Sequence, residues 1–243
     1  MRIKSTAVII FLVGIFILPK FIWSKPIDIS DNKGAYVVIL HGIGRTSRSM
    51  NEIEKKIAKA GYIPINIDYP SRKHNISELA TWLDNTLKSK KLNKSKKIHF
   101  VTHSMGGILT RKYIEKYRPE NLGRVVMLSP PNQGSEVVDF FKTYYLFKKF
   151  YGAAGQEMGT DNPTKKVNFE LGIIAGDRTI DYISSFLIIP DADDGKVAVE
   201  RTKIDGMSDH ITLHTTHAFM MKNDNVIKQI LYFIEFGKFS RED

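Results

Sequence analysis

The sequence predicts an α/β fold in which helices cover both faces of a mostly parallel central sheet. From residue 35 onward, short β-rich runs alternate with segments of helical period, the order typical of parallel strands joined by helical crossovers. The run at 35–40, AYVVIL, is apolar throughout, as expected of a strand covered on both faces. With 243 residues, 42% of them hydrophobic, the chain can bury one well-formed core. We therefore assign residues 25–243 to a single α/β domain.

Each further helix and strand follows from a local pattern. Apolar residues at helical spacing predict a helix from about Ser49, with Glu52 placed to complete a capping box. Asn75 and Glu78 predict a second capping box at the start of another helix. Helical spacing also predicts a helix from Ser104 to Arg118 and a last helix from Asp224 to Phe236. The remaining predicted strands are 62–70, 97–103, 124–130, 169–176 and 210–216.

The N-terminal segment has the features of an export signal. Arg2 and Lys4 precede an uncharged stretch at 5–19, which is shorter than the ~20 residues that span a bilayer. Trp23 is bulky where a signal peptidase favours small residues, so a cleaved signal peptide and a retained N-terminal membrane anchor both stay open for residues 1–24. We expect an exported protein, periplasmic or secreted. The alternative is a cytoplasmic protein that begins with a buried helix.

Composition excludes several classes of site. The chain has no cysteine, which rules out disulfides, thiolate metal sites and a cysteine nucleophile. The formal net charge is +10, and residues 1–26 hold four of the 36 basic residues and none of the 26 acidic ones. The basic remainder suits contact with an anionic membrane surface. Its lysines are scattered and no nucleic-acid motif accompanies them, so we expect no nucleic-acid partner, and no obligate protein partner is evident.

An aromatic segment at 137–151 stands apart from the strands and helices. It carries three lysines and seven aromatic residues, namely Phe140, Phe141, Tyr144, Tyr145, Phe147, Phe150 and Tyr151. One interpretation is an aromatic helix packed on the sheet. The other is a short lid-like insertion that walls an acyl-binding site or touches a membrane.

The stretch VTHSMGG at 101–107 places Ser104 where a strand runs into a helix. A serine on such a turn lifts its hydroxyl out of the sheet, beside the unpaired amides of the helix start, which can bind a developing oxyanion. Gly106 and Gly107 permit the close approach of strand and helix, while Thr102 replaces the first glycine of G-x-S-x-G. The alternative is that Ser104 is an ordinary helix cap.

HGIG at 41–44 and HSMGG at 103–107 together resemble the α/β-hydrolase superfamily, in particular small bacterial lipase- and esterase-like members. The resemblance covers about residues 35–236. It implies an α/β-hydrolase fold, with Ser104 as the nucleophile and the backbone amides of Ile43 and Met105 as the oxyanion hole. In that family the catalytic acid and then the histidine follow the serine along the chain.

The histidine must follow the last strand, and His210, His214 and His217 compete for the role. The 210–216 strand prediction places His210 at the start of the strand and His214 within it. His217 comes just after the strand, and TTHAFM resembles the family's histidine loop, so we favour His217.

For the acid, the D-G-x-V spacing at Asp194 resembles the family's acid loop. Asp193 and Asp177 stay open as alternatives.

These residues lead to the hypothesis of a serine hydrolase that cleaves carboxylic esters, lipase- or esterase-like, through a Ser104-His217-Asp194 triad and an acyl-serine intermediate. The expected substrate is a small-molecule ester or a lipid. The alternatives are an acyltransferase on the same fold and a non-catalytic binding or scaffold member. We expect no cofactor and no metal, because H-E-x-x-H, P-loop and dinucleotide-binding patterns are missing from the sequence. The loops at 68–72 and 129–135 follow strands, where such a sheet builds its pocket.

Overall fold

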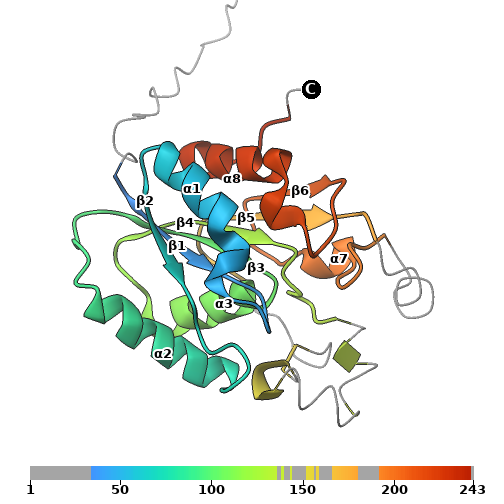
Figure 1. Ribbon diagram of the computed structural model, residues 1–243, viewed down its shortest axis with the longest axis horizontal. Coiled ribbons are helices and arrows are strands. Elements are labelled where there is room, and N and C mark those ends of the chain that lie inside the picture. The colour runs from blue at the N-terminus through green and yellow to red at the C-terminus, as the bar shows by residue number, and fades with distance from the viewer. Residues whose placement is uncertain are drawn as a thin grey trace, which may run out of the picture.

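The computed structural model describes residues 34–135, 138–139, 143, 152–155, 157–158, 166–179 and 192–241. Within these residues the chain forms a six-stranded sheet in the order β2-β1-β3-β4-β5-β6, and every strand pair is parallel (Figure 1). The strands are β1 (Tyr36–Leu40), β2 (Ile63–Ile67), β3 (Ile98–His103), β4 (Leu122–Leu128), β5 (Leu171–Gly176) and β6 (Asp209–Leu213). The predicted fold class is confirmed.

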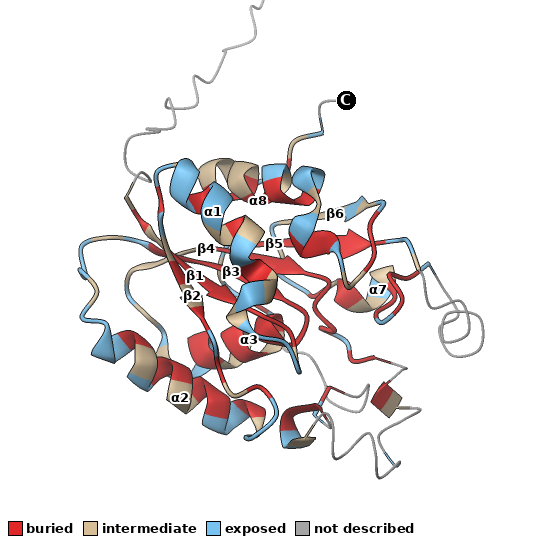
Figure 2. Ribbon diagram, viewed as in Figure 1, coloured by how far each residue is buried: buried red, intermediate tan, exposed pale blue. Residues whose placement is uncertain are grey.

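Helices cover both faces of the sheet. On one face lie α1 (Asn51–Lys59) and α8 (Asp224–Phe236), and on the other α2 (Ile76–Ser89) and α3 (Met105–Tyr117) (Figure 1). The short elements are η2 (Ser47–Met50), α7 (Val199–Thr202) and η3 (Met220–Lys222). Figure 2 shows the strands of the sheet mostly buried and the helices with their exposed sides turned outward.

The position of β1 between two layers of helices explains why its sequence is apolar throughout. Val38 belongs to the buried cluster that α2 and α3 share with the sheet, whereas its neighbour Val37 belongs to the cluster on the side of α1 and α8. Successive side chains of a strand point to opposite faces, so a strand covered on both faces needs apolar residues at every position.

Of the two capping boxes that were predicted, the structure confirms the one at the start of α2 and not the one at the start of α1. The capping box at Asn75 is confirmed: Asn75 Oδ1 accepts a hydrogen bond from Glu78 N at 2.8 Å, and Glu78 Oε2 accepts one from Asn75 N at 3.2 Å. The capping box at Ser49 is wrong. The chain forms the 3-10 turn η2 there, the Ser49 hydroxyl donates to Thr46 O, and α1 begins at Asn51 without a side-chain cap.

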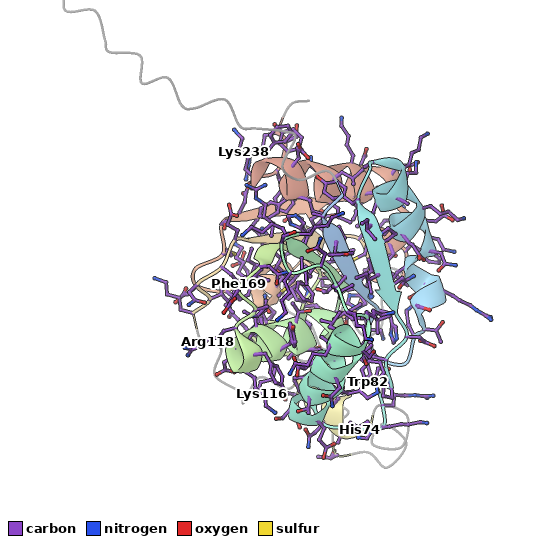
Figure 3. All side chains as sticks on the ribbon, turned by 90° about the vertical axis from the view of Figure 1, so that its left-hand side faces the viewer. His74, Trp82, Lys116, Arg118, Phe169 and Lys238 are labelled. Atoms are coloured by element: carbon purple, nitrogen blue, oxygen red, sulfur yellow. The ribbon has the colours of Figure 1, made fainter. Side chains whose placement is uncertain are left out.

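The helices α2 and α3 are joined directly on their own face of the sheet. Lys116 Nζ of α3 donates to Thr81 Oγ1 of α2 at 2.8 Å, and Trp82 of α2 packs against the core (Figure 3). This hydrogen bond links the two helices near the C-terminal end of α3, the end away from Ser104.

Two predictions fall outside what the structure describes. The segment 1–24 lies wholly outside it, and so do the seven aromatic residues of the segment 137–151, so the signal or anchor and the lid stay predictions. Among the residues that are described, no helix is both long enough and apolar enough to cross a bilayer.

Candidate active site

Ser104 occupies a strained turn between β3 and α3. Its backbone has φ 54° and ψ −124°, a conformation that residues with a side chain rarely adopt. The turn is held by hydrogen bonds from Ser104 N to Leu128 O and from Gly107 N to Ser104 O. The Ser104 side chain makes no capping hydrogen bond to α3, so the helix-cap alternative is wrong. The hydroxyl instead borders a cavity.

Two glycines let the backbone pack tightly around this turn. A Cβ atom at Gly106 would lie 2.9 Å from the carbonyl oxygens of both Leu40 and His41, at the end of β1. A Cβ atom at Gly42 would lie 3.2 Å from the Cβ atom of Ser104. The loop after β1 therefore lies directly against the Ser104 turn. Gly106 is required by the close approach of two backbones, and Gly42 by the side chains of His103 and Ser104.

The loop after β1 presents a free amide to the cavity. The carbonyl oxygen of Gly42 accepts hydrogen bonds from His41 Nδ1 at 2.8 Å and from Arg45 N at 3.2 Å. Because the Gly42–Ile43 peptide is planar and trans, the N–H of Ile43 points away from those two donors. Within the described residues neither Ile43 N nor Met105 N donates a hydrogen bond. Both amides are therefore unpaired in the described part of the chain, and Ile43 is among the residues that line the cavity.

The loop at 68–72 braces the loop after β1. The Tyr69 hydroxyl donates to His41 O at 2.7 Å, and the Tyr69 ring stacks on the His41 ring with centroids 4.3 Å apart. Ser71 Oγ accepts a hydrogen bond from Gly44 N at 3.1 Å. This loop therefore supports the loop that carries Ile43, although none of its residues is among the described residues that line the cavity.

His217 is held by a buried carboxylate. His217 Nδ1 lies 2.7 Å from Asp194 Oδ2, and Asp194 is only 1% exposed. The other oxygen, Asp194 Oδ1, accepts hydrogen bonds from the backbone amides of Lys196 at 3.0 Å and Val197 at 2.9 Å. The backbone amide of His217 in turn donates to Asp194 O at 2.9 Å. Since Nδ1–H donates to the carboxylate, Nε2 of His217 is left as the proton acceptor.

The alternative carboxylates have other partners. Asp193 Oδ1 accepts a hydrogen bond from Gly195 N at 2.6 Å, which holds the turn. Asp177 follows β5 and lies 3.1 Å from Nδ1 of His214. Of the three candidate acids, Asp194 is therefore the one in contact with His217.

The three candidate histidines also differ clearly in position and contacts. His210 lies in β6, and its Nε2 is 2.9 Å from Thr202 Oγ1. The strand β6 ends at Leu213, so the prediction that His214 lies within the strand is wrong; it follows the strand, with its side chain 75% exposed. Only His217 of these three is among the described residues that line the cavity beside Ser104.

Ser104, Ile43 and His217 line one cavity. Its empty volume is about 750 Å³, which includes open solvent at its mouth. Pro131 and Ser135 of the loop at 129–135 also line it, as its position after β4 predicts. No hydrogen bond joins Ser104 and His217 in the described part of the chain. Catalytic hydrogen bonds of this kind often tighten only when substrate is bound.

Sequence reasoning missed one residue of the site. His103, fully buried at the end of β3, donates from Nε2 to the carbonyl oxygen of His217 at 3.0 Å, and the two rings lie 4.6 Å apart. Burial, then the nearby charges of His217 and Arg45, hold the pKa of His103 well below its usual value. It therefore stays neutral and ties the histidine loop to the strand that carries Ser104. The only signal was its position directly before Ser104.

No group of three histidine, aspartate, glutamate or cysteine side chains in the described residues could hold a metal ion.

Three comparisons place the chain among known proteins. The family model for palmitoyl protein thioesterase matches residues 36–167. No curated protein matches the sequence. The structure resembles the mature form of a Bacillus licheniformis lipase, with a TM-score of 0.66, 18% identity and coverage of 84% of this chain and 92% of that one.

Two further solved structures have a similar fold. A thermophilic esterase from Thermogutta terrifontis has a TM-score of 0.60 and 13% identity, over 85% of this chain and 91% of its own. A type II thioesterase of the yersiniabactin biosynthetic pathway has a TM-score of 0.57 and 14% identity, over 86% of this chain and 96% of its own. At such identities the likeness shows the α/β-hydrolase fold. Because the family match spans more than half of the 243 residues, the chain belongs to the palmitoyl protein thioesterase family, a group of hydrolases within the α/β-hydrolase superfamily.

Proposed function

We propose that the protein hydrolyses carboxylic esters or thioesters with Ser104 as the nucleophile. His217 Nε2 takes the Ser104 proton as Oγ bonds to the acyl carbon, and the amides of Ile43 and Met105 stabilise the oxyanion. His217 then donates that proton to the alkoxide or thiolate as its bond to the acyl carbon breaks. The alcohol or thiol departs, and the acyl group stays bonded to Ser104. Water attacks the acyl carbon with His217 again as the base, releasing the carboxylic acid and restoring Ser104.

The observation that carries this proposal is the buried contact between Asp194 and His217 beside a serine on a strained turn. A carboxylate fixed by two amides orients the imidazole and stabilises its charge after proton transfer. The free amides of Ile43 and Met105 supply the remaining part of the chemistry. The lipase, esterase and thioesterase of similar fold, together with the family match, support ester cleavage.

The test is hydrolysis of p-nitrophenyl esters and of matched acyl thioesters of increasing chain length. We expect Ser104→Ala to lower kcat by on the order of 10⁶-fold with unchanged folding, because it removes the nucleophile. Ser89→Ala, an exposed serine on α2, serves as the matched control and keeps full activity. Equal activity of Ser104→Ala and the wild type would overturn the proposal. Product analysis with added alcohols or amines separates hydrolysis from acyl transfer.

We also propose that the protein is exported, with residues 1–24 as the signal or anchor. The motivating pattern is the two basic residues ahead of the apolar stretch at 5–19. Fractionation of cells that express the full chain, with N-terminal sequencing of the product, tests this. Recovery in the cytoplasm with an intact N-terminus would contradict export.

A further inference from the structure

One edge of the sheet carries a dense group of basic side chains. It is the edge where the strands begin, and the loop at 90–97 joins α2 to β3 there. Residues 88–97 contain six lysines and no carboxylate. With two residues from the C-terminal end of α3, these lysines form what we call the basic edge, which consists of Lys88, Lys90, Lys91, Lys94, Lys96, Lys97, Lys116 and Arg118. Figure 3 shows Lys116 and Arg118 close together on α3.

Side-chain contacts hold the two parts of the basic edge side by side. The ammonium of Lys88 lies 5.7 Å from the centre of the Tyr117 ring, and that of Lys116 lies 5.4 Å from the same ring. The loop that follows α3 is joined to the lysine-rich loop by a hydrogen bond of 2.8 Å from Asn121 Nδ2 to Lys96 O. The fold therefore gathers these charges in one region.

Most of these charges have no carboxylate partner. Asp84 pairs with Lys88 at 2.6 Å, and Glu115 pairs with Lys112 at 3.1 Å. The lysines at 90–97 make no ion pair within the described residues. Favourable interaction with the C-terminal ends of α2 and α3 accounts for lysines in their last turns, but not for the three that follow at 94–97. These three need another explanation.

The excess positive charge of the domain is concentrated at this edge. Residues 27–243 hold 32 of the 36 basic residues and all 26 acidic ones, an excess of six positive charges. The basic edge has eight basic residues, and Asp84 and Glu120, close to them in the chain, add two negative charges, which again leaves six. The rest of residues 27–243 is therefore balanced in charge. A surface that concentrates the whole excess in one place attracts an anionic partner.

The chain enters the domain at the same edge. A Cβ atom added to Gly34, with which the described residues begin, would lie 3.4 Å from Lys96 Nζ. Lys96 Nζ also lies 5.8 Å from the centre of the Tyr36 ring in β1. Residues 1–33 are therefore joined to the domain beside the basic edge. A retained N-terminal anchor, one of the two forms proposed for residues 1–24, would hold this edge against a bilayer.

We propose that the basic edge binds the anionic surface of a lipid membrane. Lysines close to such a surface each strengthen binding about fivefold. Ser104 follows the last residue of β3, whose six residues span ~20 Å, so the cavity lies at the opposite edge of the sheet. The bound protein therefore turns its cavity toward the solution. This binding does not depend on Ser104 or on the proposed hydrolysis.

Co-sedimentation of the full chain with lipid vesicles measures this binding. The vesicles are phosphatidylcholine alone and phosphatidylcholine with about 30% phosphatidylglycerol, and the measured quantity is the ratio of the anionic to the neutral partition coefficient. Every variant keeps residues 1–33, so the contribution of that segment is the same throughout. We expect the triple variant Lys90→Gln/Lys94→Gln/Lys97→Gln to lower the ratio roughly 100-fold, about fivefold for each lysine, and added salt to lower the wild-type ratio.

The matched control removes the same charge elsewhere. Lys73→Gln/Lys222→Gln/Lys228→Gln changes three exposed lysines, in the loop after β2, in η3 and in α8, and should keep the wild-type ratio within about threefold. An equal loss in both triple variants, or a wild-type ratio of about one, overturns the proposal. So does displacement of the anionic vesicles by a duplex oligonucleotide at an equal concentration of phosphate, which would assign the basic edge to a nucleic acid.

A second measurement tests the orientation, because a chain without cysteine can be labelled at one introduced cysteine. Ser77→Cys and Ser89→Cys place a label at either end of α2, at exposed positions about 18 Å apart. Ser89 lies between two lysines of the basic edge, whereas Ser77 lies at the edge where the strands end. We expect the emission of an environment-sensitive dye to shift to the blue on anionic vesicles at Ser89→Cys only. A shift at Ser77→Cys without one at Ser89→Cys would place the cavity on the membrane and overturn the proposal.

Discussion

Two of the histidine–aspartate pairs in the described residues lie at the end of the sheet where β5 and β6 finish. His217 and Asp194 lie 2.7 Å apart, and His214 and Asp177 lie 3.1 Å apart, so distance hardly separates them. Burial does. The side chains of the first pair are 13% and 0% exposed, and those of the second are 75% and 38% exposed.

The difference between the pairs shows what makes such a contact chemically useful. Two backbone amides fix the Asp194 carboxylate and exclude water from it, whereas Asp177 faces solvent that screens its attraction to His214. Only the first pair borders the cavity that contains Ser104. We infer that the same two residue types orient a catalytic base in one place and form a weak surface ion pair in the other.

The largest difference between the two pairs is expected when each carboxylate is removed in turn. Asp194→Asn should lower kcat by about 10⁴-fold, because the amide no longer holds the histidine in the tautomer that accepts a proton. Asp177→Asn should change kcat by less than about twofold, because a solvent-exposed pair contributes only about 0–1 kcal/mol. Steady-state kinetics on one ester measures both. Equal losses in the two variants would remove the distinction between the pairs.

Burial also predicts how stability responds to acid. His99 is buried in β3, and burial together with the charges of Arg124 and Lys97 lowers its pKa to about 4. Between pH 6.5 and about 4 the unfolded chain binds a proton that the folded chain does not, so the free energy of unfolding falls as the pH is lowered through this range. The contribution of His99 is about 3 kcal/mol at its full extent.

His99→Asn isolates this contribution. The asparagine oxygen can still accept the hydrogen bond that His99 Nδ1 accepts from Arg124 N, but it has no proton to bind. We expect the urea-unfolding free energy of this variant to fall by about 3 kcal/mol less than that of the wild type between pH 7 and pH 4. His74→Asn, at an exposed histidine, is the control and should follow the wild type. Parallel curves for all three proteins would contradict the prediction.

A smaller effect is expected where backbone packing supports the buried pair. A Cβ atom at Gly176 would meet the carbonyl oxygen of Thr215 and lie 2.9 Å from the Cβ atom of Asp194. Gly176→Ala should therefore lower the free energy of unfolding by about 1–3 kcal/mol and reduce kcat, because Asp194 must shift to make room. Thermal unfolding and ester kinetics on the same sample check this. A fully stable and fully active variant would show that the pair does not depend on this close contact.

Local patterns were enough to predict the sheet, the helices on its two faces and the turn at Ser104. Each of these depends on residues that are neighbours in the sequence, such as the alternation of Val37 and Val38 between two cores or the glycines after Ser104. Asp194 was chosen because its D-G-x-V spacing resembles the acid loop of the family. In the structure the two amides that hold its carboxylate, those of Lys196 and Val197, follow it directly in the chain.

What the sequence did not predict depends on contacts between distant residues or on competition between turns. The hydrogen bond from His103 to the His217 carbonyl joins residues 114 positions apart and uses a backbone acceptor, which leaves no pattern in the sequence. The last strand was predicted to end at residue 216, but β6 ends at Leu213. The prediction ran too far because HITLHTT keeps strand-like alternation beyond the last paired residue. At Ser49 a 3-10 turn stands where a helix cap was predicted. Serine occurs in both kinds of turn, so the residue type alone did not distinguish them.

The most direct test of the account is the rate at which a fluorophosphonate labels Ser104. The reaction needs the serine proton to be removed, so it reports on the histidine that removes it without depending on the natural substrate. We predict that His217→Ala slows labelling by at least about 10³-fold, that His214→Ala labels at the wild-type rate, and that peptide mass spectrometry places the label on Ser104. Wild-type labelling of His217→Ala, or a label on another serine, would contradict the assignment of Ser104 and the buried pair as the catalytic centre.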